Sequence, residues 1–155
     1  MTISVADTIA EAVKTALNAS GGPLFTATTK ATRKHAFRYT LEEVARVDAA
    51  TEEEPIITVF PKSYSRTRTS RTTWAYSHEI GVCVQAYCQF SDTTRIDELT
   101  LFVEGISDFI TTAGHMANAP LMAATLDPIF DPQHLETANQ FHSTPTFTFR
   151  YERST

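Results

Sequence analysis

The sequence predicts an α+β fold: a mainly antiparallel sheet with two helices packed on one face and a protruding β-hairpin arm. Three observations carry this prediction. Residues 79–90 alternate between polar and apolar, a period of two that indicates a strand with one buried and one exposed face. Residues 5–19 and 94–113 each carry apolar side chains at helical spacing. A polar insert at 62–73, rich in arginine and threonine, separates two apolar strands.

The length and composition predict one domain over residues 1–155. A chain of 155 residues can bury a core of its own, and 42% hydrophobic with 20% charged residues is ordinary for a globular protein. No run of about 18 apolar residues is present to span a membrane. The first residues lack the charged and apolar regions of a signal peptide. We therefore expect a protein made in a cytoplasm and used or assembled there, with no membrane partner.

The first helix is expected to begin at Ser4, which can cap it together with Asp7, and to end at the Gly21, Gly22, Pro23 run. Its apolar stripe consists of Val5, Ile9, Val13, Ala16 and Leu17.

Residues 24–39 are rich in threonine and are interpreted as one strand that pairs with the apolar strand 55–60. Between these two strands, 41–45 fits a single helical turn. The acidic stretch 48–54 lacks the spaced glycine of a calcium loop, so we interpret it as a solvated loop.

The alternating strand and the helix that follows it are predicted to pack on each other. The apolar positions of the strand are Ile80, Val82, Val84, Ala86, Cys88 and Phe90, and the helix stripe is Leu99, Val103, Ile106 and Ile110. Asp92 or Thr94 can cap this helix, and Gly114 follows its end. On this pattern Cys88 is buried and Cys83 exposed; they point to opposite faces and cannot form a disulfide with each other.

The C-terminal part is predicted to be mainly β. Residues 121–130 indicate a short strand, which is stopped by the Asp-Pro pairs at 127–128 and 131–132. Residues 145–153 indicate another strand, with Phe147, Phe149 and Tyr151 on one face. The stretch 134–141 fits either a helix or a strand.

The sequence contains no recognisable catalytic or cofactor-binding motif. The five histidines have no close ligand spacing with cysteine or acidic residues, which argues against zinc, and no phosphate-binding glycine loop is present. Ser70 beside Arg71, and Ser77 beside His78, lack the context of a nucleophile elbow. We expect a protein that is not an enzyme and that uses no cofactor or metal.

The charges are distributed unevenly along the chain. Residues 1–71 carry a net charge of +2 and residues 72–155 a net charge of −7. A basic arm and an acidic body allow copies to associate head to tail, although both sets of charges can also be simply solvated. The candidate interface residues are Lys62, Arg66, Arg68 and Arg71 in the insert. Three interpretations of this arm stay open: a contact with a partner protein, a solvated loop, or a nucleic-acid contact.

The order of these segments resembles that of the tail-terminator (tail-completion) proteins from the neck of long-tailed bacteriophages. The resemblance spans most of the chain and rests on pattern and order. The residues that carry it are the helix at 7–19, the segment 37–43, the strand ending in Val59, Phe60 and Pro61, Thr69 to Arg71 before the alternating strand, Ile96 to Leu99 at the start of the second helix, and Thr146 to Phe149. Phe60 and the arginine-rich insert are this chain's own variation.

The resemblance implies a structural virion protein that assembles in the host cytoplasm. Subunits of this family form a hexameric ring that caps the tail tube, stops its polymerisation and offers a surface to the head-completion or connector proteins. DNA is then expected only as it passes through the lumen of the ring. Two alternatives stay open: another head–tail connector ring, such as a head-closure or adaptor protein, and a small DNA-binding protein that uses the basic arm.

Overall fold

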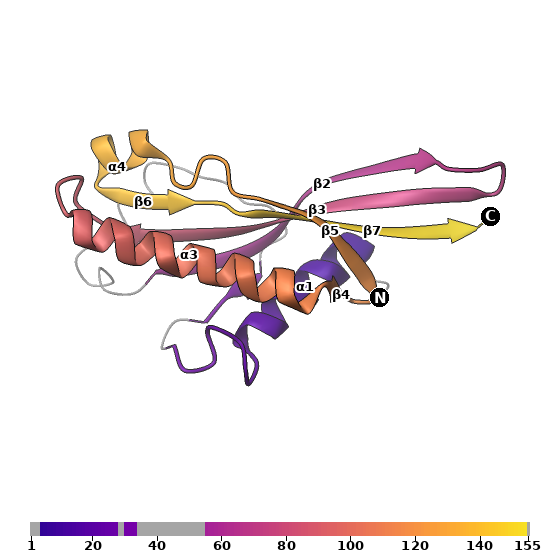
Figure 1. Ribbon diagram of the computed structural model, residues 1–155, viewed down its shortest axis with the longest axis horizontal. Coiled ribbons are helices and arrows are strands. Elements are labelled where there is room, and N and C mark those ends of the chain that lie inside the picture. The colour runs from indigo at the N-terminus through magenta and orange to yellow at the C-terminus, as the bar shows by residue number, and fades with distance from the viewer. Residues whose placement is uncertain (1–3, 28–29, 34–54, 155) are drawn as a thin grey trace.

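The computed structural model describes residues 4–27, 30–33 and 55–154, and Figure 1 shows their arrangement. The elements in chain order are α1 (Val5–Asn18), β1 (Thr32–Arg33), β2 (Ile56–Arg68), β3 (Thr73–Tyr87), α3 (Thr93–Ala113), β4 (His115–Met116), β5 (Ala119–Thr125), α4 (Pro132–Ala138), β6 (Gln140–Ser143) and β7 (Thr146–Ser154). The sheet order is β1-β2-β3-β7-β5-β4, and β6 also pairs with β3. Only the β1–β2 pair is parallel among the described strands, so the predicted α+β class is confirmed.

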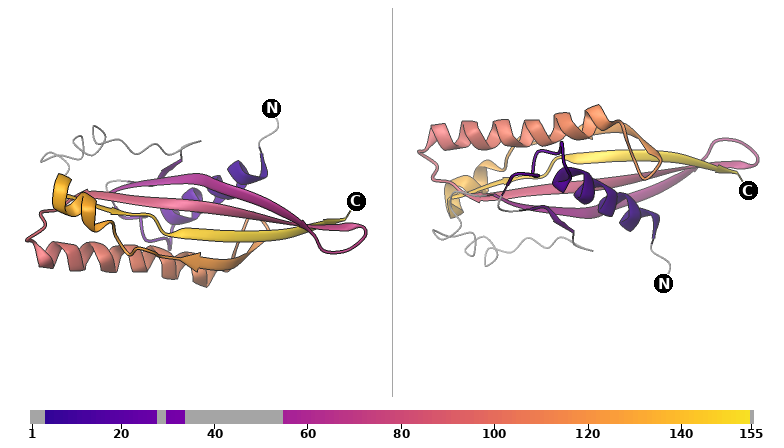
Figure 2. Two further views of the ribbon diagram at one scale, coloured as in Figure 1. Left: turned by 90° about the horizontal axis from the view of Figure 1, so that it is seen from above. Right: turned by 90° about the horizontal axis from the view of Figure 1, so that it is seen from below.

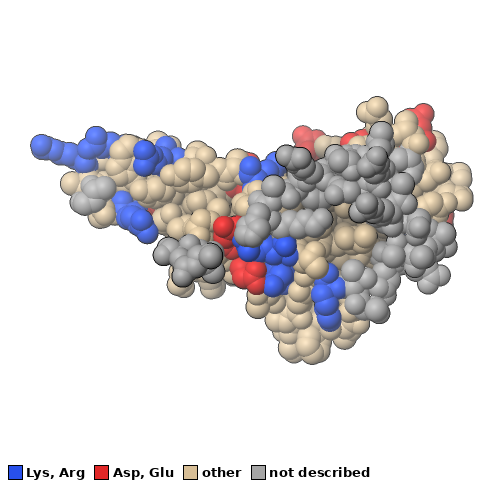
Figure 3. Space-filling view, turned by 180° about the vertical axis from the view of Figure 1, so that it is seen from behind, with Lys and Arg blue, Asp and Glu red and all other residues tan. Residues whose placement is uncertain are grey.

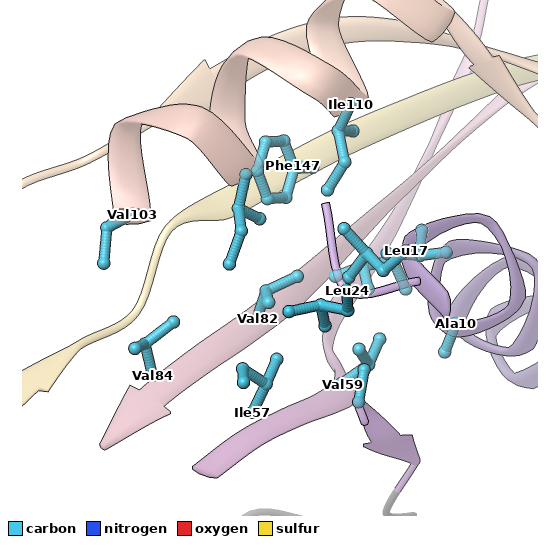
Figure 4. Close-up of a cluster of buried hydrophobic side chains, with 14 of the residues drawn as sticks. Ala10, Leu17, Leu24, Ile57, Val59, Val82, Val84, Val103, Ile110 and Phe147 are labelled. Carbon is cyan, nitrogen blue, oxygen red and sulfur yellow. The ribbon is translucent and has the colours of Figure 1, made fainter. Parts of the chain in front are cut away.

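Helices α1 and α3 cover one face of the sheet. In the right-hand view of Figure 2, α1 crosses the strands obliquely and α3 runs along them. Figure 4 shows that side chains from both helices meet those of β2, β3 and β7 in a single core. The labelled members of this core are Ala10, Leu17, Leu24, Ile57, Val59, Val82, Val84, Val103, Ile110 and Phe147. All of them are at most 1% exposed, so this contact is the main hydrophobic core of the body.

The helix ends follow the predicted capping residues. The Ser4 side chain accepts a hydrogen bond from the Asp7 backbone N–H at 3.1 Å, and Asp92 accepts one from Arg95 N–H at 3.1 Å. Gly114 has a φ of 74°, and its N–H reaches the Ile110 carbonyl. A left-handed residue at this position favours glycine, which explains why α3 ends there.

The prediction of one wet face on β3 is wrong for the central part of the strand, where every residue from 80 to 86 is buried. Cys83, expected to be exposed, has no accessible surface. On this second face the Phe60 ring covers Gly81, its cross-strand partner, so closely that a Cβ on Gly81 would lie 2.5 Å from the ring. His142 lies beside Cys83 on the same face. The odd-numbered residues of β3 are small or polar, so the alternating pattern predicted an exposed face. The sequence pattern did not reveal that the rings of Phe60 and His142 lie against Gly81 and Cys83.

The prediction that Phe90 packs on the stripe of α3 is also wrong, because Phe90 is 57% exposed. Strand β3 ends at Tyr87, and the chain turns through residues 88–92 into the helix. The alternating pattern therefore continued in the sequence beyond the strand itself. Cys88, by contrast, is buried as predicted.

The single strand predicted at 24–39 is wrong in its described part. Residues 20–26 form turns that place Leu24 in the core, and the strand is only the two residues of β1. Asn18 explains this, because its side-chain amide donates to the Ala31 carbonyl and accepts from the Ala31 N–H, at 3.0 and 2.9 Å. Pairing with the 55–60 strand is confirmed at Thr32 and Arg33. Residues 34–54, with the predicted helical turn and acidic loop, lie outside the described residues.

The C-terminal strands lie close to their predicted positions. Strand β5 begins two residues earlier than expected and ends at Thr125, and β7 spans nearly the predicted range. The ambiguous stretch divides into helix α4 followed by β6. Asp131 caps α4 by accepting hydrogen bonds from the backbone N–H groups of Gln133 and His134, and Pro132 occupies its first turn.

Candidate functional site

The arm is the outer half of the β2–β3 hairpin, which protrudes from the body in Figure 1. Strands β2 and β3 remain paired out to Arg68 and Trp74, and the N–H groups of Thr69 and Ser70 close the turn on the Thr73 carbonyl at 3.0 and 3.3 Å. The predicted hairpin is therefore confirmed. Strand β7 adds a third strand, since it pairs with β3 as far as Thr73, and this third strand was not predicted.

The two faces of the arm differ in chemistry. Directly opposite residues of antiparallel strands point to the same face, and the pairs include Arg66 with Tyr76 and Arg68 with Trp74. We call this face the arginine–aromatic face; its members are Tyr64, Arg66, Arg68, Trp74, Tyr76, His78, Tyr151 and Arg153. The opposite face carries Ser63, Ser65, Thr67, Ser77, Glu79, Arg150 and Glu152.

The side chains of the arginine–aromatic face contact one another along the arm. The guanidinium carbons of Arg66 and Arg68 lie 5.3 and 5.8 Å from the centre of the Trp74 ring. Such cation–π contacts contribute about 0.5–1 kcal/mol each at exposed sites. They hold long basic side chains on a defined surface, where the exposed Arg66 can reach a partner.

A ladder of rings continues this face toward the body. The His78 ring lies between those of Tyr64 and Tyr151, with centres 5.1 and 5.7 Å apart, and Tyr76 stacks on Tyr151 at 5.0 Å. Burial lowers the pKa of His78 and raises the pKa of Tyr151, so both rings are neutral near pH 7. The positive charge of the face therefore comes from its arginines.

The four predicted interface residues fall into four different settings. Arg66 lies on Trp74, in the middle of the arginine–aromatic face. Arg68 shares that ring but also donates to the carbonyls of Ser70 and Arg71, so it holds the turn. Arg71 is exposed at the tip.

Lys62 is separated from the three arginines. It occupies the bulge between Pro61 and Ser63, and its Nζ donates to Thr146 Oγ1 at 3.2 Å. Thr146 pairs with Gly81, whose position in β3 places it on the opposite face of the sheet from His78. The structure therefore brings together Arg66 and Arg68 with Arg71 at the tip, and places Lys62 at the base of the arm.

Sequence reasoning missed the contribution of β7 to this face. Tyr151 and Arg153 join it because they pair with Tyr76 and Trp74. The expected alternation of Phe147, Phe149 and Tyr151 was a signal for one shared face, but the partner strand could not be identified from it. Figure 3 shows the resulting concentration of lysine and arginine along the protruding end of the molecule.

A second cluster was also missed, on the face of the body that Phe60 covers. Cys83 Sγ lies 3.4 Å from His142 Nε2, the rings of His142 and His134 meet edge-on at 4.9 Å, and His134 Nδ1 lies 3.5 Å from an Asp131 carboxylate oxygen. Burial, and then the neighbouring His134, lower the pKa of His142 to about 4, against the opposing effect of Asp131. His142 is therefore neutral near pH 7. The Cys83 thiol is fully buried, so this cluster is a packed polar contact in the described structure.

The described residues contain no group of three or more histidine, cysteine, aspartate or glutamate side chains positioned to hold a metal ion. Within the same ranges, no helix is long and apolar enough to cross a membrane.

The fold is similar to that of a chain in the virion of a native gene transfer agent (GTA) particle. The match has a TM-score of 0.54 at 13% sequence identity, and it covers 98% of this chain and 100% of that chain. At this identity the likeness shows the fold alone. No protein-family model and no curated protein matches the sequence.

Proposed function

We propose that this chain is a structural virion protein whose subunits form a ring in the neck of a phage-like particle. In this role the ring caps the tail tube, ends its polymerisation and joins the tail to the head. The subunit is assigned no catalytic activity, cofactor or metal. A hexamer is the stoichiometry implied by the resemblance to tail terminators.

The observation that carries this proposal is the full-length match in fold to a chain of a virion particle. The match covers 98% of this chain and 100% of that chain, so the likeness involves the whole fold and not one segment of it. The match supports a structural role in a virion. The more specific role in a neck ring rests on the resemblance of the sequence to tail terminators.

The arm supplies a surface for assembly. Arg66 and Arg71 are exposed, Tyr64 is 54% exposed, and the arm extends beyond the helices of the body. Arginine and aromatic side chains are enriched in protein interfaces, where a planar guanidinium pairs with carboxylates in a defined orientation. We propose that this face contacts a neighbouring subunit or the tail-tube protein.

A growth-arrest experiment tests the ring and its role together. Tail-tube protein is polymerised with and without this chain, and tube lengths are measured by negative-stain electron microscopy. We expect tubes that stop growing and carry a ring at one end. Tubes of unchanged length, without a ring at either end, would contradict the proposal. A ring that binds purified portal or adaptor protein and leaves tube growth unchanged would favour another connector ring.

The arm also gives DNA binding a specific basis, because Arg66 and Arg68 lie directly opposite the aromatic residues Tyr76 and Trp74, and aromatic rings can stack on bases. Retention on single-stranded DNA that falls steeply with salt, without any ring formation, would favour this second function. Ring formation that is independent of DNA would favour the structural role.

A further inference from the structure

The outward side of α3 carries a stripe of acidic residues around an exposed leucine. Asp97, Glu98, Glu104 and Asp108 are all exposed, and Leu101 is 70% exposed. Arg95 is the one basic residue of this helix, and it lies 3.6 Å from Glu98. The buried side of the helix uses Leu99, Val103, Ile106 and Ile110, so Leu101 contributes nothing to that core.

The stripe is similar to the arm in length and opposite to it in charge. Asp97, Leu101, Glu104 and Asp108 follow one another at helical spacing and span about 16 Å at 1.5 Å per residue. From Tyr64 to Arg68 the arm extends about 13 Å, with Arg71 beyond it at the tip. Residues 55–78 contain no acidic side chain at all, so the hairpin opposes the stripe in charge along most of its length.

Gly105 adds an independent observation at the centre of the stripe. A Cβ at this position would meet no atom within 4 Å, so the fold itself does not require glycine here. Glycine in a helix interior is unfavourable by roughly 1 kcal/mol relative to alanine. Its presence beside Leu101 leaves helix backbone accessible to a flat side chain from another molecule.

We infer that the acidic stripe of α3 in one copy binds the arginine–aromatic face of the arm in a second copy. Arg66 and Arg71 pair with the carboxylates of the stripe, and Trp74 or Tyr64 covers Leu101 and the backbone at Gly105. Within one chain, the arm extends away from the body while α3 lies along it (Figure 1), so the contact requires a second copy. The inference rests on the proposed self-assembly and names the surfaces that carry it.

Charge reversal on each surface tests the contact. The arm variant is R66E with R71E, which spares Arg68 because it holds the turn, and the stripe variant is D97K with E104K. We expect each variant to stay folded but to weaken self-association at least tenfold, measured by native mass spectrometry and sedimentation. Mixing the two variants should restore assembly, since the reversed charges then face each other. E136K, at an exposed acid of α4, is the control and should assemble normally.

A stripe variant that assembles as well as the wild type would overturn the inference and leave the ring proposal intact. Loss of assembly in both single variants without recovery in the mixture would also overturn it. The wild-type chain could instead form only a closed dimer. If each variant loses this dimer and the mixture of the two variants restores it, the result would support the contact and contradict the ring. G105Q gives a further readout: its thermal midpoint should equal or exceed that of the wild type while association weakens. Unchanged association would exclude close approach at this point.

Discussion

Strands β2 and β3 build both the body and the arm, yet different interactions hold the two regions. In the body, Ile57, Val59, Val82 and Val84 are at most 1% exposed and pack under two helices. In the arm the same strands carry stacked rings and arginines on one face and mainly small side chains on the other, among them Ser65, Thr67, Ala75 and Ser77. A fully buried aliphatic side chain contributes about 1.5–3 kcal/mol, whereas an exposed cation–π pair contributes about 0.5–1 kcal/mol. The body therefore determines the stability of the fold, and the surface residues of the arm can bind a partner without a large loss of stability.

The largest expected difference between the regions comes from placing the same charge in each. Val84→Asp buries an unpaired carboxylate between the sheet and the helices and should cost at least about 4 kcal/mol or prevent folding. Thr67→Asp places it on the exposed side of the arm and should change the free energy of unfolding by less than about 0.5 kcal/mol. Urea titrations of both variants measure the difference, and similar losses would mean that the arm is part of the cooperative core.

The largest contribution to the pH dependence of stability should come from His142 in the body. The folded pKa of His142, about 4, lies below the unfolded value of 6.5, so the unfolded chain binds more protons between these pH values. Stability should therefore fall as the pH drops from about 6.5 to 4, by up to about 3 kcal/mol from this group. His142→Gln should flatten the profile in urea titrations at pH 7.5 and 5. His78 shifts in the same direction, so a residual slope is expected, but an unchanged slope would contradict the assignment to His142.

Within the arm, Arg68 and Arg66 are expected to differ. Arg68→Ser removes two hydrogen bonds to the turn and should lower the protection of the Thr69 and Ser70 amides against hydrogen exchange by about 1 kcal/mol. Arg66→Ser removes one contact with Trp74 and should lower the protection of these two amides less. Equal protection in both variants would show that the turn does not depend on Arg68.

The smallest effect concerns Gly105, where alanine should stabilise the isolated subunit by about 0.5–1 kcal/mol because the position is open and helical. Gly21→Ala is the matched control, because that residue also has open space but a φ of +88°, where alanine is strained. Thermal unfolding should move in opposite directions for the two variants. Destabilisation by Gly105→Ala would mean that this segment of α3 is less regular than described.

The sequence was most informative where a local signal was complete. Capping residues at Ser4, Asp92 and Gly114 marked the helix ends, because a cap satisfies backbone groups within a few residues. The hairpin was predictable for a similar reason, since a polar insert between two strands has few other arrangements.

Sequence reasoning failed where the determining contact was distant in the chain. Cys83 was judged exposed because its partners, His142 and the covered face around Phe60, come from other strands. In the described part of the strand predicted at 24–39, the prediction failed at Ala31, because the Asn18 side chain bonds to the backbone N–H and carbonyl of that residue. The candidate site shows the same limit: the arginines were identified, but Tyr151 and Arg153 join them only through the register of β7 on β3. Register depends on the whole sheet and cannot be derived from one strand.

The most direct test of the separation between body and arm measures stability and mass on one protein, the R66E and R71E variant. The free energy of unfolding should stay within about 1 kcal/mol of the wild type, because both side chains are exposed. The native mass should fall from that of the ring to that of a monomer. A variant that keeps the wild-type mass would contradict the claim that the arm binds the neighbouring copy. A variant that loses its fold along with its assembly would contradict the claim that the body alone determines stability.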